Sequence, residues 1–113
     1  MVINGREIGL FYSVGAHCAY SDYLIKNPED SVSSAIIQKA ILMNKAWLDA
    51  KKQAGETDLP KALTRAELYA LPMAVLNQLA DEVAAQEKAD TEVTVEVAEP
   101  KGKNGKSAAK KQG

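Results

Sequence analysis

The sequence contains little of what most catalytic and metal-binding sites are made from. It has one cysteine and one histidine among 113 residues, and only 5% of its residues are aromatic. A single cysteine excludes an intramolecular disulfide framework, and a structural zinc site would need about four ligands at recognisable spacing. No run approaches the roughly 18 apolar residues of a membrane span, and residues 1–10 lack the basic and apolar regions of a signal peptide.

The chain also lacks an excess of charge of either sign. The chain has 14 basic and 15 acidic residues and a net charge of −1, so no global field steers it towards nucleic acid or a membrane. Hydrophobic residues make up 46% of the chain, and most are alanine, leucine, isoleucine or valine. This composition favours a helical core, and the length leaves room for one domain.

The N-terminus has the pattern of a short β-hairpin. Two β-prone runs, Val2-Ile3 and Ile8–Tyr12, flank the dipeptide Asn4-Gly5. This dipeptide tolerates the positive φ angles of a type I′ turn. Two strands alone are marginally stable in water, so the hairpin must rest on helices.

The remainder of the domain is predicted to be helical. Ser13 and Asn27 are candidate N-caps, the latter followed by Pro28 at the first helical position. Thr64 and Glu67 fit a capping box. We therefore expect four helices, over residues 13–25, 27–53, 64–71 and 72–89, which with the hairpin gives a mainly α fold of the α+β class.

The composition changes after residue 89. Residues 90–100 carry acidic side chains and no base, and residues 101–113 carry five lysines and no acid. We expect a small helical interaction domain over residues 1–89 and a charged, disordered tail over residues 90–113. One alternative stays open, because the strict alternation of Thr91–Val97 is also typical of a strand.

No motif indicates catalysis. His17 and Cys18 are adjacent, but neighbouring side chains on a helix point about 100° apart, so we expect a boundary histidine and a half-buried cysteine. Gly105-Lys106-Ser107 resembles the end of a phosphate-binding loop, although Pro100 stands where that loop needs glycine. The lysines of residues 101–113 come without arginine or aromatic residues, which favours weak, nonspecific contacts. We predict no enzyme and no cofactor.

The order of these signals resembles a known family. The hairpin segment Ile3–Ile8, the junction Val14-Gly15, the segment Leu63–Leu68 and the lysine-rich end together resemble the small tail assembly chaperones of long-tailed, siphovirus-like phages and prophages, most closely those of gut Firmicutes. The resemblance covers residues 1–90. No catalytic residue carries over, since the family has none.

The resemblance implies a function and its partners. A chaperone of this family binds the tape-measure protein, keeps it soluble and helps the major tail tube protein to polymerise. It acts in the cytoplasm of the bacterial host and is absent from the mature virion. Self-association through the helices is left open, as is a frameshifted extension at the C-terminus.

Apolar helix faces suggest where a partner binds. The expected surface combines the second helix with the tyrosine face of the first, and it consists of Tyr20, Tyr23, Ile36, Ile41, Met43 and Trp47. Two alternatives belong to other classes. One is a small phage regulator or inhibitor that binds a host protein or nucleic acid, and the other is a structural head-to-tail adaptor.

Overall fold

The computed structural model describes residues 1–92 and confirms a mainly helical fold with an N-terminal hairpin. The elements are β1 (Val2–Ile3), β2 (Arg6–Glu7), α1 (Val14–Lys26), α2 (Val32–Gln53), α3 (Arg65–Tyr69) and α4 (Met73–Thr91). None of the helices in residues 1–92 has the length and apolar character that a membrane span requires.

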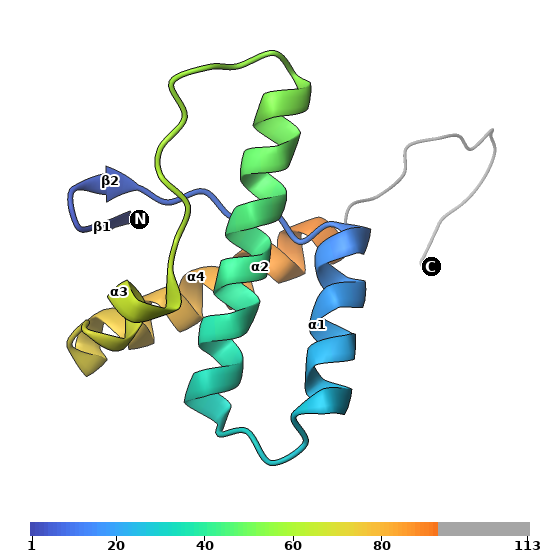
Figure 1. The fold of residues 1–113 in the computed structure, drawn as a ribbon, viewed down its shortest axis with the longest axis vertical. Coiled ribbons are helices and arrows are strands. Elements are labelled where there is room, and N and C mark those ends of the chain that lie inside the picture. Colours follow the sequence, from blue (N-terminus) through green and yellow to red (C-terminus); the bar gives the residue numbers. More distant parts are fainter. Residues whose placement is uncertain (93–113) are drawn as a thin grey trace, which may run out of the picture.

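The longest helix, α2, is the centre of the fold. It contacts α1, α3 and α4. Figure 1 shows α1 and α2 side by side as an antiparallel pair, with α4 crossing behind α2 and the hairpin on the side away from α1. The long connection between α2 and α3 runs back along α2 to reach this crossing. The core therefore lies where α2, α3, α4 and the hairpin meet.

The hairpin has the expected turn. Asn4 and Gly5 have φ angles of 51° and 79°, as a type I′ turn requires. The strands pair antiparallel, with Val2 opposite Glu7 and Ile3 opposite Arg6. Ile3 is only 2% exposed, so the hairpin does rest its apolar face on the helices.

The predicted second strand over Ile8–Tyr12 is wrong, because β2 ends at Glu7. No strand lies beside the segment that follows. Instead the backbone N–H of Phe11 donates to the carbonyl of Met43 at 3.0 Å, and the carbonyl of Gly9 accepts from Asn44 Nδ2 at 3.0 Å. We call residues 8–12 the strap, because this segment crosses α2 and is fastened to it by hydrogen bonds.

The cap of α1 is confirmed and that of α2 is corrected. Ser13 Oγ accepts from the N–H of Ala16 at 3.0 Å at the start of α1. The prediction that Asn27 starts α2 is wrong, because Ser31 is the N-cap and its Oγ accepts from Ser34 N at 3.1 Å. Asn27 instead caps the end of α1, where its N–H donates to Tyr23 O.

The last two helices begin as predicted. Thr64 and Glu67 form both hydrogen bonds of a capping box at the start of α3, and Pro72 precedes the first residue of α4. The helix α4 continues to Thr91, and Asp90 accepts from the N–H of Tyr12 at 2.8 Å. The helical part therefore extends past the expected boundary at residue 89. The rest of the alternating stretch and the tail, residues 93–113, lies outside the described residues.

The core is aliphatic, as the composition predicted. It is formed by Ile3, Ile8, Ile37, Ala40, Met43, Leu63, Leu68, Leu76, Leu79 and Val83. Among residues 1–92, one polar side chain, that of Asn44, is buried as deeply, at 2% exposure. Its amide bonds both to the strap and to the N–H of Leu63, which donates to Asn44 Oδ1 at 2.9 Å. Asn44 thus holds two extended segments on the same turn of α2.

Candidate partner-binding site

An open groove lies between α1 and α2. Its volume is about 460 Å³, and its lining has far more apolar than polar surface. The lining residues are Phe11, Ser13, Gly15, Ala16, Ala19, Leu42, Lys45, Ala46, Asp49, Ala50 and Gln53. We call this hollow the α1–α2 groove.

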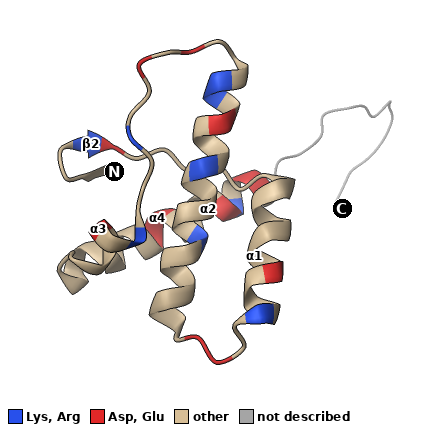
Figure 2. Ribbon diagram, in the orientation of Figure 1, with Lys and Arg blue, Asp and Glu red and all other residues tan. Residues whose placement is uncertain are grey.

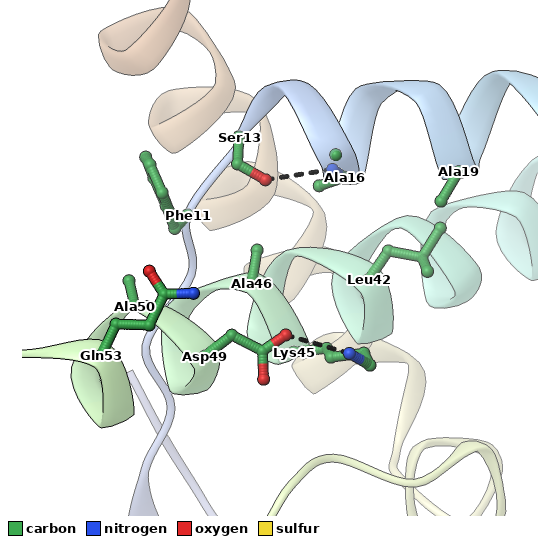
Figure 3. Close-up of a pocket in the computed structure, with 11 residues that line it drawn as sticks. Phe11, Ser13, Ala16, Ala19, Leu42, Lys45, Ala46, Asp49, Ala50 and Gln53 are labelled. Atoms are coloured by element: carbon green, nitrogen blue, oxygen red, sulfur yellow. Dashed lines mark hydrogen bonds and ion pairs between the residues drawn. The ribbon is translucent and has the colours of Figure 1, made fainter.

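Small residues create the groove. Figure 3 shows Ala16 and Ala19 of α1 facing Leu42 and Ala46 of α2, with no large side chain filling the space. Leu42, Ala46 and Ala50 follow each other at four-residue spacing, which places them in one row along α2. These small side chains leave space between the two helices, and this space forms the groove.

The ends and rim of the groove are defined by three side chains. Phe11 stands at one end, 37% exposed, because the hydrogen bond from its N–H to Met43 O fixes the strap there. Lys45 and Asp49 form an ion pair of 2.9 Å on the rim, and both side chains are largely exposed. The groove has an apolar floor and a rim of balanced charge, which is suited to an amphipathic helix.

Met43 is not a surface residue, so its expected part in a binding surface is wrong. It is 0% exposed and lies in the core. Ile41 is half-buried and packs against the same core. The spacing that suggested an apolar face on the second helix was real, but α4 and the hairpin cover that face.

The remaining predicted residues do not form one exposed face. Ile36 and Trp47 are half-buried on α2, and the Trp47 ring lies against Gly9 of the strap. Tyr20 and Tyr23 are half-buried on α1. None of the six predicted residues lines the α1–α2 groove. A role of these four half-buried residues in partner binding stays a prediction, because part of each side chain is exposed.

The two predicted tyrosines are held by polar contacts. The hydroxyl of Tyr23 donates to Asp30 in a short hydrogen bond, which lowers the pKa of the Asp30 carboxyl. The ring of Tyr20 lies 5.1 Å from the ammonium of Lys39, as does the ring of Tyr12. Cation–π contacts of this kind fix aromatic rings in place, so Tyr20 helps to position α1 on α2, while Tyr23 bonds to the connection between the two helices.

A second hollow of about 340 Å³, lined mostly by residues with polar side chains, lies beside the start of α1. It is lined by Tyr12, Ser13, Val14, His17, Glu87, Asp90 and Thr91. Here the hydroxyl of Tyr12 and Nδ1 of His17 are 2.6 Å apart. Lys39 forms an ion pair with Glu87. Burial, followed by the charge of Glu87, raises the pKa of Tyr12, so this hydroxyl stays protonated.

This polar hollow has the composition of a structural network. Tyr12 is joined to α1 through His17 and to α4 through Asp90, so its bonds tie the strap to both helices. Cys18 is exposed rather than half-buried. No group of three or more potential metal ligands occurs within residues 1–92. Ser13 and His17 both line this hollow, but Ser13 Oγ accepts from the N–H of Ala16 and His17 bonds to Tyr12, so the α1–α2 groove is the better candidate site.

The groove could have been anticipated only in part. Alanine at positions 46 and 50, one turn apart, marks a helix face with little bulk. The sequence does not say that α1 presents its own small residues to that face. Comparisons of the chain with family models, curated proteins and solved structures give no match.

Proposed function

We propose that this protein is a tail assembly chaperone of a long-tailed phage, which binds apolar helical segments of the tape-measure protein and keeps that protein soluble in the host cytoplasm. The proposal rests on one observation, the apolar α1–α2 groove with its floor of alanines. Helix-in-groove recognition needs such a trough, because an amphipathic helix inserts its apolar side chains between two helices.

The chemistry of the groove fits a chaperone partner better than a small ligand. The floor offers backbone and methyl groups, with few polar groups to fix the orientation of a small molecule. A tape-measure protein presents long apolar helical faces before the tail tube encloses it. A shallow trough of small residues accepts many such faces, because it demands no particular side chain.

The test is co-expression with the tape-measure protein encoded in the same gene cluster. Wild-type protein is expected to keep the tape-measure protein in the soluble fraction and to co-purify with it. Ala50→Glu places a carboxylate on the groove lining at an exposed position, so it should abolish co-purification without unfolding the domain. Full co-purification with Ala50→Glu would contradict groove binding.

A matched variant controls for added charge. Ala85 is exposed on α4 and faces away from the core residues Leu79 and Val83, since its position on the helix is opposite to theirs. Ala85→Glu should therefore co-purify as wild type does. Mass spectrometry of purified virions separates the chaperone from a structural adaptor, because only the adaptor is retained in the particle.

A further inference from the structure

The outward face of α1 carries exposed aliphatic residues. Val14 and Ile25 are 81% and 76% exposed, while Ala16 on the opposite side is buried. The charged residues of this helix, Asp22 and Lys26, lie in its C-terminal half, and Figure 2 shows the N-terminal part of α1 without charge.

Val14 and Ile25 end a row of residues with the spacing of a coiled-coil seam, and between them lie the exposed Cys18 and the half-buried Ser21. Val14, Cys18, Ser21 and Ile25 are separated by four, three and four residues, which is the a/d spacing of a heptad. We call these four residues the α1 seam. It carries no charge, so neither an acidic nor a basic partner is selected by it.

The α1 seam is symmetric about its own midpoint. Val14 and Ile25 lie equally far from the midpoint of the seam, which falls between Ala19 and Tyr20, and so do Cys18 and Ser21. We propose that two copies of the protein pair through antiparallel α1 helices, with Val14 of one copy opposite Ile25 of the other. Cys18 then meets Ser21 at the crossing, where two small side chains allow close approach. An isologous twofold interface requires this self-complementarity.

The flanks of the seam are compatible with the same arrangement. In an antiparallel pair, the residues on one side of the seam contact the residues on the same side of the seam in the second copy. Leu24, 41% exposed, then packs beside His17 of the second copy, and Asp22 lies opposite Gly15 rather than opposite another charge. Antiparallel helices also place opposite ends of the helix dipoles together, which a parallel pair does not.

Further apolar surface extends the contact. Val32, 78% exposed, begins α2 at the same end of the α1–α2 pair as Ile25 (Figure 1). The seam consists of four residues on one short helix, whereas each partner of a standard interface contributes roughly 20–30 residues. We therefore expect a dimer that forms and dissociates with protein concentration.

Analytical ultracentrifugation of the full chain over a wide concentration range tests the pairing. Wild type should shift from monomer to dimer. Val14→Glu and Ile25→Lys should each raise the dimer dissociation constant about tenfold or more, because they place charges in an apolar seam. Both positions are exposed, so circular dichroism should show an unchanged fold. Val2→Glu, a change at an exposed position on the hairpin, should leave the dimer intact.

An equal mixture of the two variants tests the direction of the helices. Antiparallel pairing sets the glutamate at position 14 opposite the lysine at position 25, so the mixture should recover the dimer that each variant alone has lost. A parallel pair puts equivalent positions together and gives no recovery.

Two results would overturn the proposal. One is a wild-type dimer that Val14→Glu and Ile25→Lys do not weaken. The other is a wild-type monomer at every concentration; if these variants then unfold at lower urea, the seam is covered by the chain itself. Neither result bears on the α1–α2 groove, because co-purification with the tape-measure protein is measured separately.

Discussion

Gly9 lies directly against the indole ring of Trp47. A Cβ atom at position 9 would be 2.0 Å from Cε2 of that ring, far inside any normal contact. The close approach lets the carbonyl of Gly9 reach Asn44 Nδ2 at 3.0 Å. The strap can therefore follow the surface of α2 only because position 9 has no side chain.

The first prediction concerns Gly9→Ala. The added methyl group must displace either the Trp47 ring or the strap, so we expect a loss of about 1–3 kcal/mol in the free energy of unfolding. Urea unfolding followed by circular dichroism measures it. Gly15→Ala is the control, because its Cβ would meet nothing nearer than Ser13 Oγ at 3.8 Å and alanine favours a helix by up to about 1 kcal/mol.

A second substitution isolates the contact. If the cost of Gly9→Ala comes from the ring, then Trp47→Leu should reduce it, and the two changes should couple by about 0.5 kcal/mol or more in a double-mutant cycle. Strict additivity would mean that Gly9 is needed for another reason.

The second prediction concerns Asn44. Its amide is the donor to Gly9 O and the acceptor for Leu63 N, and the side chain is 2% exposed. Asn44→Leu leaves a buried N–H and a buried carbonyl without their partner, so we expect a loss of about 2–3 kcal/mol. Chemical denaturation measures it, and Asn77→Leu on the exposed face of α4 is the control.

Hydrogen exchange adds a local measurement. The amide of Leu63 should lose protection in Asn44→Leu, because its acceptor is gone. Retained protection would show that another group accepts from Leu63.

Local sequence signals predicted the elements well where one segment contains the whole interaction. The turn at Asn4-Gly5 and the capping box at Thr64 are complete within four residues. The start of α2 was misplaced because two capping signals lie close together. Ser31 caps this helix, whereas Asn27, the predicted cap, ends α1 by donating its N–H to the carbonyl of Tyr23.

Long-range contacts explain the other errors. Residues 8–12 are β-prone, but only Ile8 bonds back to the hairpin, through its N–H to the carbonyl of Met1. The segment then bonds to Met43, Asn44 and Asp90 on two helices. The groove was missed for the same reason, since its alanines belong to two helices whose relative position the sequence does not state. Pattern alone therefore separated helix from loop better than it separated core from surface.

The third prediction concerns Met43, whose side chain was expected at the surface and is buried. Met43→Ala should cost about 2–5 kcal/mol, the usual range for removing a large side chain from a core. Thermal or urea unfolding measures it. Leu24→Ala, which removes a similar side chain that is 41% exposed, should cost much less. Equal costs would contradict the burial of Met43.

The fourth prediction concerns the ion pair between Arg6 and Glu67, which fastens the hairpin to α3. Arg6 Nη2 lies 2.5 Å from Glu67 Oε2, and both side chains are less than one-fifth exposed. The hydrogen bond from Arg6 is the main cause that lowers the pKa of Glu67 from 4.5 to about 2. Bonds from the N–H of Thr64 and from Asn4 act in the same direction.

A carboxyl whose pKa is lower in the folded state binds fewer protons there than in the unfolded chain. Its contribution to stability is complete above pH 4.5 and is lost as the pH falls towards 2. We expect about 1–2 kcal/mol to be lost across this window, less than full linkage gives because solvent and salt screen the pair.

Glu67→Gln should be less stable at neutral pH and should show a flatter decline below pH 4.5. Glu82→Gln, an exposed change on α4, should decline as wild type does, and an equally steep decline in Glu67→Gln would assign the acid sensitivity to other carboxyls.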